Sequence, residues 1–157
     1  MQLDERKELV KQVSRLLSSL TKEEKEEVFS KVLKEKKGIP ISVFSAEISS
    51  LEIIVKYLKD VENFSFKKIS SVLNRQLSTL YTTYHKADLK FKNSFDVSDK
   101  SVLIPFDLFV NRKYSVLESI VAYLVKEGFS LVKIANLLGK NYNTVKTVYR
   151  RYKIKNA

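Results

Sequence analysis

The stretch that decides the fold is FSLVKIANLLGKNYNTVKTVYRRY at Phe129–Tyr152, because the related stretch FSFKKISSVLNRQLSTLYTTYHK at Phe64–Lys86 occurs 65 residues earlier. Two more pairs match in the same order. IPISVF at 39–44 matches IPFDLF at 104–109, and LEIIVKYL at 51–58 matches LESIVAYL at 117–124, with one residue inserted between these blocks in the second copy. Collinear matches of this kind indicate a duplicated structural unit.

Helical periodicity and capping residues predict three helices in the second copy. The first has apolar residues at i, i+3, i+4 and i+7, namely Leu117, Ile120, Val121 and Leu124, and ends at Gly128. Ser130 is placed to cap a second, short helix that stops at Gly139, and Asn141 to cap a third. The buried face of the third helix is predicted to hold Val145, Val148 and Tyr149.

The second copy resembles the helix-turn-helix of sigma factor region four, of LuxR-type regulators and of Hin-like recombinases. The similarity rests on a hydroxyl residue followed by Ile134-Ala135, Leu138-Gly139 and Thr144-Val145. The first copy is a weaker match, since Ser70 replaces the small alanine and Asn74 the turn glycine. The resemblance implies tandem trihelical units whose third helices enter the major groove of double-stranded DNA.

The resemblance also implies which residues contact DNA. The candidates for base contacts are Tyr142, Asn143, Lys146, Thr147 and Arg150 in the second copy, and Leu77, Ser78, Tyr81, Thr82 and His85 in the first. The candidates for phosphate contacts are Lys140, Arg151, Lys153, Arg75 and Lys86. Side-chain chemistry agrees independently, because asparagine suits adenine and arginine suits guanine.

The charge distribution favours a polyanionic partner. The chain of 157 residues has a formal charge of +11, of which residues 102–157 contribute +7 from 10 basic and 3 acidic residues. With no cysteine and one histidine, we predict no metal site and no cofactor. No phosphate-binding glycine loop or nucleophile–base pair is recognisable, so we predict a protein that is not an enzyme.

The predicted fold class is all-α, with an amphipathic helical hairpin at 1–37, helix-turn-helix units at 38–87 and 103–157, and a polar linker at 88–102. Fully extended, the fourteen residues 88–101 of this linker span at most roughly 45 Å, enough for both units to reach one duplex. In 1–37, a capping box at Thr21 and Glu24 starts the second helix. The apolar stripes of this hairpin suggest a homodimer, or packing on the rest of the chain.

Three functions remain open at this point. The first is a transcriptional regulator with two DNA-reading helices, and the second is an architectural, nucleoid-associated protein that binds mainly phosphates. The third is a protein-interaction adaptor of the transcription machinery. The absence of a long apolar run or signal sequence predicts a cytoplasmic protein without membrane contact.

Overall fold

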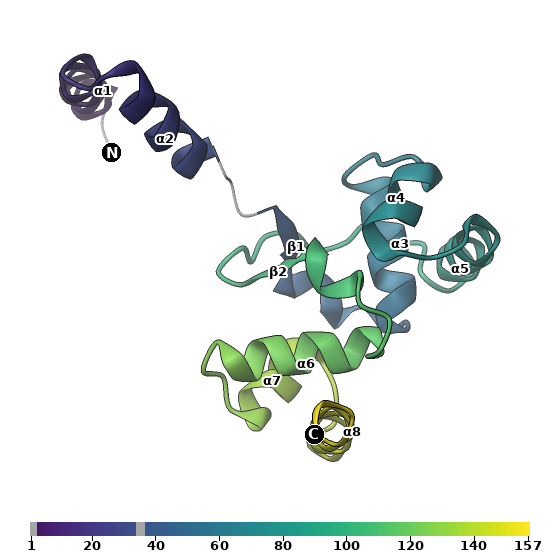
Figure 1. Ribbon diagram of the computed structural model, residues 1–157. Helices are drawn as coiled ribbons and strands as arrows, with labels where there is room; N and C mark the ends of the chain where they lie inside the picture. Colours follow the sequence, from purple (N-terminus) through teal and green to yellow (C-terminus); the bar gives the residue numbers. More distant parts are fainter. Residues whose placement is uncertain (1–2, 34–36) are drawn as a thin grey trace. The chain divides into compact units, whose positions relative to one another are not determined.

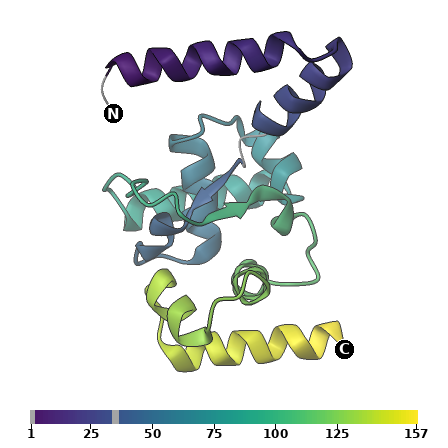
Figure 2. The same cartoon turned by 90° about the vertical axis from the view of Figure 1, so that its left-hand side faces the viewer.

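The computed structural model describes residues 3–33 and 37–157, and it is predominantly helical (Figures 1 and 2). The described residues form eight α-helices, two short 3₁₀-helices and a sheet of two three-residue strands. The predicted all-α class is therefore confirmed, with a small sheet added. The chain divides near residue 37 into two compact units.

The N-terminal unit consists of α1 (Leu3–Ser18) and α2 (Lys22–Leu33). The predicted capping box is present: the Thr21 N–H donates to the Glu24 carboxylate at 2.8 Å, and the Glu24 N–H donates to Thr21 Oγ1 at 3.2 Å. Along both helices several large apolar side chains are exposed: Leu9, Val10, Val13, Leu16, Phe29 and Val32.

The first copy of the repeat contains α3 (Ser50–Asp60), α4 (Phe66–Leu73) and α5 (Leu77–Lys90). The Ser65 side chain caps α4, and Asn74 ends it in the left-handed conformation with φ 50°. Asparagine tolerates this conformation better than most residues, so it can stand where the second copy has glycine. All three helices contact one another.

The second copy contains α6 (Val116–Lys126), α7 (Leu131–Leu138) and α8 (Tyr142–Asn156). The predicted caps are confirmed: Ser130 accepts from the Lys133 N–H, Asn141 accepts from the Asn143 N–H, and Gly139 has φ 59°. Val145 and Val148 are buried as predicted. Local sequence therefore determined where these helices begin and end.

Two strands were not predicted. β1 (Gly38–Pro40) and β2 (Leu103–Pro105) pair antiparallel, with Ile39 opposite Ile104 and both side chains fully buried. A Cβ added to Gly38 would lie 2.8 Å from the Ile104 carbonyl oxygen, so glycine permits the close approach of the strands. Strands this short show no alternating pattern in the sequence, and their partner lies 65 residues away.

A short 3₁₀-helix follows each strand, η1 (Ile41–Ser45) after β1 and η2 (Phe106–Phe109) after β2. Phe44 and Phe109, at equivalent positions of the repeat, are buried in the core. However, η1 contacts α7 of the second copy, and η2 contacts α4 of the first. The boundaries 38–87 and 103–157 mark the repeated sequence, whereas the packing crosses between the copies.

The connection between the copies is more ordered than a polar linker. Residues 88–90 of the predicted linker belong to α5, and Phe91, Phe95 and Val97 are half-buried against the core. The Phe91 and Phe95 rings stack with centroids 5.1 Å apart, and the Ser42 hydroxyl donates to the Asp96 carbonyl at 2.7 Å. These contacts attach the connection to η1, so it does not act as a free tether.

Both copies use the same buried glutamate to join the first helix to the third. Glu52 and Glu118 complete capping boxes at the starts of α3 and α6, and each also accepts from a lysine near the end of the third helix. Lys90 Nζ lies 2.8 Å from Glu52, and Lys155 Nζ lies 2.7 Å from Glu118. Burial alone would raise the pKa of both carboxyls, but these hydrogen bonds outweigh it and lower each pKa.

Replacing either glutamate should weaken the fold in a pH-dependent way. Because the folded pKa is lowered, the stabilisation is present above the unfolded pKa near 4.5 and is lost as pH falls through the folded value. Glu52→Gln and Glu118→Gln should each reduce the free energy of unfolding at pH 7 by about 1–3 kcal/mol. Urea denaturation at pH 7, 5 and 3 measures this loss. The free energy of unfolding of each variant should also fall less steeply between pH 7 and pH 3 than that of the parent. The exposed control Glu127→Gln should keep the parent profile, and a parent-like profile for Glu118→Gln would contradict the role.

Candidate functional site

The exposed face of α8 carries most of the residues predicted to contact a polyanion. Asn141 fixes the start of the helix, and Val145 and Val148 hold its inner face in the core. This leaves the predicted residues at the surface: Tyr142, Asn143, Lys146, Arg150, Arg151 and Lys153 are exposed, and Thr147 and Lys140 are half-buried. The residues of α8 that pack in the core are therefore different from the polar and basic residues that it exposes.

The charge of α8 is entirely positive. The helix has five basic residues and no acidic residue. Among the ion pairs of the described residues, only Lys155 belongs to this helix, and Lys146 and Arg150 have no carboxylate within ion-pair distance. Unneutralised cations on one helix face produce the local positive potential that attracts an anionic polymer.

The equivalent helix α5 presents a different surface. Its predicted base-contacting residues are all exposed: Leu77, Ser78, Tyr81, Thr82 and His85. Several of them already have partners within the protein, since the Thr82 hydroxyl donates to the Ser78 carbonyl at 3.0 Å and the Tyr81 ring lies 4.3 Å from that of Phe66. Lys86 is exposed and Arg75 is half-buried, so α5 offers few free cations.

A polar network on the inner side of α5 further reduces its positive charge. Buried Lys56 on α3 contacts Asp60 and, on α5, Asp88, with each N–O distance 2.8 Å. The Tyr84 hydroxyl also donates to Asp60 at 2.8 Å. Burial lowers the pKa of Lys56, but the two carboxylates outweigh it and the pKa is raised. The lysine is therefore kept charged and neutralised inside the first copy.

The second copy does not have this network. The positions equivalent to Lys56, Asp60 and Asp88 are Ala122, Lys126 and Lys153. Two carboxylates are thus replaced by two exposed lysines. The two helices have the same scaffold but different charge, since α5 has two lysines and one aspartate whereas α8 has five basic residues and no acidic residue.

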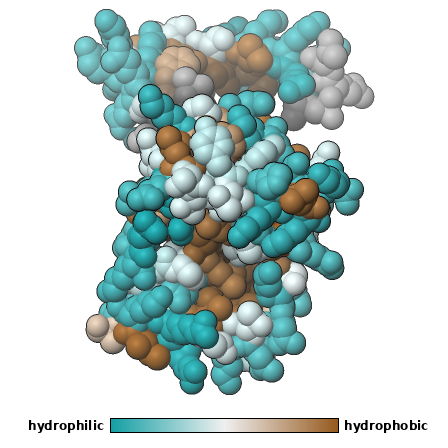
Figure 3. Space-filling view, turned by 90° about the vertical axis from the view of Figure 1, so that its right-hand side faces the viewer, coloured by the Kyte–Doolittle hydropathy of each residue, from teal (hydrophilic) through white to brown (hydrophobic). Residues whose placement is uncertain are grey.

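Arg75 and Lys140, at equivalent positions in the two turns, line one shallow hollow of about 420 Å³ with the starts of α3 and α6. Figure 3, seen from the right-hand side of Figure 1, shows an apolar strip surrounded by hydrophilic side chains. Burial and the charge of Arg112 lower the pKa of Arg75. Arg112 is not among the residues predicted from the sequence to contact DNA. It lies in the loop that carries the residue inserted in the second copy, and this insertion is the feature of the sequence that marks the loop.

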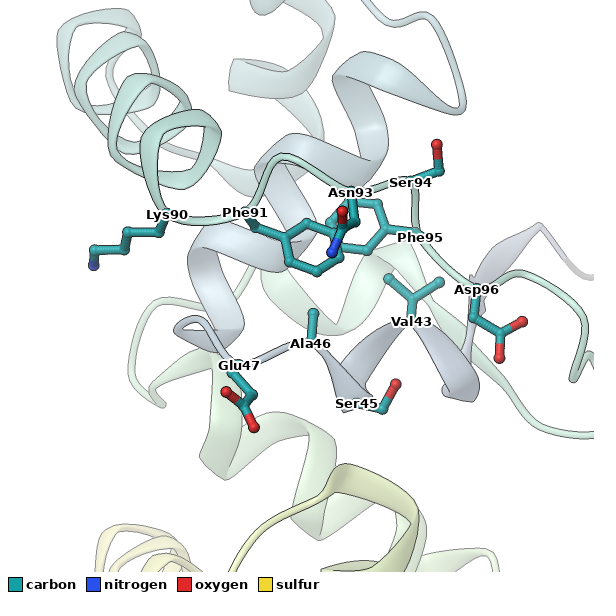
Figure 4. A pocket seen from close by; sticks show the side chains of 10 residues that line it. All are labelled: Val43, Ser45, Ala46, Glu47, Lys90, Phe91, Asn93, Ser94, Phe95 and Asp96. Atoms are coloured by element: carbon teal, nitrogen blue, oxygen red, sulfur yellow. The ribbon is translucent and has the colours of Figure 1, made fainter.

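A second hollow, of about 520 Å³, lies between η1 and the connection that follows α5 (Figure 4). The close-up shows Phe91 and Phe95 on one side, with Val43 and Ala46 facing them, while Lys90 points away. Its charged lining residues are Lys90, Glu47 and Asp96, and Lys90 is already paired with Glu52.

Metal sites and membrane spans can be assessed for residues 3–33 and 37–157. No group of three or more metal-ligating side chains occurs there, and none of these helices is both long and apolar enough to cross a membrane. Comparisons with models of protein families, with curated proteins and with solved structures find no match. Function is therefore inferred from the surfaces of α5 and α8.

The Lys56 network can be tested separately from any binding activity. Asp60→Asn with Asp88→Asn leaves a buried ammonium without a carboxylate and should lower the free energy of unfolding, although solvent screening of the two partly exposed aspartates limits the loss. Adding Lys56→Met removes the buried ammonium and should recover most of the lost free energy of unfolding. Denaturant titrations of the double and triple variants measure both effects, with exposed Asp107→Asn as control. A triple variant no more stable than the double variant would show that the ammonium is not the source of the loss.

Proposed function

We propose that residues 37–157 bind double-stranded DNA through two helix-turn-helix units, α4–α5 and α7–α8, and that the protein is a transcriptional regulator. The observation that carries the proposal is the exposed surface of α8, which combines Lys146, Arg150, Arg151 and Lys153 with polar groups suited to base edges. The left-handed turn at Gly139 between the capped helices α7 and α8 supports the same assignment.

Within this proposal α8 is the principal recognition helix. Asn143 and Arg150 have the hydrogen-bonding groups that distinguish adenine and guanine in the major groove. Arg151, Lys153 and Lys140 hold the helix by phosphate contacts. The α5 surface contributes less affinity because it is mainly hydroxyl and aromatic and because Asp88 offsets its charge.

One binding experiment separates this function from the two alternatives. Fluorescence anisotropy with random duplexes and with selected duplexes, each at two salt concentrations, gives both the salt slope and the specificity ratio. A regulator shows a large specificity ratio, whereas an architectural protein shows a steep salt slope and a ratio near one. An adaptor of the transcription machinery does not bind free DNA at all.

The proposal predicts unequal contributions from the two copies. Arg150→Ala with Arg151→Ala should weaken DNA binding far more than the matched pair His85→Ala with Lys86→Ala at the equivalent positions of α5. It should also reduce the slope of log affinity against log salt by up to about two, one for each positive charge removed. Anisotropy titrations between low and moderate salt measure both quantities. Equal losses from the two pairs would contradict the dominance of α8.

We also propose that the N-terminal helices join two chains. Their exposed apolar side chains form a surface that a second copy can cover, and their polar faces mix acidic and basic residues rather than being uniformly basic. A mixed polar face suits self-association better than attachment to an anionic membrane.

Sedimentation of the full chain tests this dimer. Val13→Glu with Leu16→Glu places two charges on the apolar face and should shift the protein from dimer to monomer. The control is Lys11→Glu, which makes the same change in net charge on the polar face of α1 and should leave the dimer intact. If the parent chain already sediments as a monomer at micromolar concentration, the proposed dimer is wrong.

A further inference from the structure

The two strands of the sheet are equivalent segments of the repeat, paired about their own centre. Ile39 and Ile104, which are equivalent at the offset of 65, lie directly opposite each other. Gly38 pairs with Pro105 and Pro40 pairs with Leu103, so exchanging the two copies leaves the register unchanged. An antiparallel pair with this symmetry has a two-fold axis between its two central residues.

Contacts elsewhere are reciprocal in the same way. η1 contacts α7, and its counterpart η2 contacts α4. At the turns, the Asn74 side chain donates to the Val110 carbonyl at 3.2 Å, and the equivalent Gly139 lies against Ser45, the counterpart of Val110. α3 also contacts its own counterpart α6. Each contact between the copies therefore occurs twice, the second time with the two copies exchanged. This is the property of an isologous, two-fold interface.

The hollow between the copies has the same symmetry. It is lined by four pairs of equivalent positions: Ser49 and Ser115, Ser50 and Val116, Leu51 and Leu117, and Arg75 and Lys140. Copies related by translation would place different positions of the repeat on the two sides of their contact. Strands, 3₁₀-helices, turns and hollow therefore all indicate rotation by 180°.

The two-fold relation determines how α5 and α8 are presented. Helices exchanged by a two-fold axis point in opposite directions when they lie across that axis, and Figure 1 shows both nearly end-on, with their axes roughly aligned. The connection between the copies is packed on the core, so this arrangement is built into the fold. One chain thus resembles a helix-turn-helix dimer whose two subunits have been joined.

We infer that a single chain recognises an inverted repeat in double-stranded DNA, with α8 on one half-site and α5 on the other. This inference rests on the proposed function and specifies the class of DNA site. Local symmetry of B-DNA makes an inverted repeat the natural match for a protein two-fold axis, whereas a direct repeat matches translation. Non-specific binding along DNA would not need a two-fold axis in the protein. Recognition of two unrelated half-sites would not need one either.

The half-sites are related but not identical, because the presented side chains have diverged. Thr82 and Thr147 are the same at equivalent positions, whereas His85 corresponds to Arg150 and Tyr81 to Lys146. The α8 half-site is therefore selected more strictly, and the α5 half-site tolerates more substitutions.

The experiment uses the absence of cysteine from the chain. Thr79 and Thr144 are exposed, equivalent threonines in the first turns of α5 and α8, and neither is assigned to base or phosphate contact. Thr79→Cys or Thr144→Cys gives one attachment point for an iron chelate that cleaves nearby DNA. Each labelled full chain is bound to a duplex selected from a random pool, and the cuts are mapped on both strands.

The two-fold relation predicts cuts from the two variants that are mirror-placed about the centre of the site. It also predicts that reversing one half-site, which converts the inverted repeat into a direct repeat, weakens binding about tenfold or more because several base contacts are lost. Val13→Glu with Leu16→Glu in the same chain excludes help from a second copy, and the duplex should still bind one chain.

The outcomes are distinct. Cuts displaced in the same direction in each half-site, or equal affinity for the direct repeat, would overturn the two-fold assignment while DNA binding stands. Cleavage by the Thr144→Cys label alone would overturn it too, because α5 would then lie away from the duplex. Failure of the parent chain to bind any duplex would instead remove the proposed function, and the inference with it.

Discussion

Backbone pairing of β1 with β2 is the interaction on which the arrangement of the two copies depends. Ile39 and Ile104 are fully buried, so the backbone N–H and C=O groups around them need hydrogen-bond partners within the protein. Each strand provides these partners for the other strand. A ribbon of three-residue strands is only marginally stable by itself. Its stability comes from η1 and η2, which continue each strand onto the helices of the opposite copy and close one common core.

The same scaffold supports two surfaces of different chemistry. Glu52 and Glu118 keep their capping boxes and their lysine partners in both copies, because these contacts determine how the first and third helices meet. Around this constant link, the position of Lys56 has become Ala122 and two carboxylates have become lysines. The replacement removes a costly buried charge and adds exposed positive charge near α8. Structural and binding requirements are thus met by different residues, which lets one copy change its surface without losing its fold.

A packed connection has consequences that a flexible tether would not have. Flexible linking raises the effective concentration of a second binding unit but leaves its orientation free. Here Phe91 and Phe95 pack on the core and Ser42 holds the Asp96 carbonyl, so the orientation of the copies is set before any ligand arrives. A surface that is already arranged loses less conformational entropy on binding than a flexible one. It therefore favours a partner whose geometry matches the fixed spacing of the two copies.

The sequence by itself determined the repeat, the positions of the helices in the second copy, the capping box at Thr21 and which face of α8 is exposed. The repeat is visible as similar sequence, and the helices and caps depend on interactions within about four residues, so caps such as Ser130 and Asn141 can be identified from the linear order. The tertiary structure alone decided that the copies exchange their 3₁₀-helices, that residues 91–97 are packed, and that Lys56 is neutralised by Asp88. Each of those results joins residues more than thirty positions apart, where many partners are compatible with the local pattern and only simultaneous burial selects one.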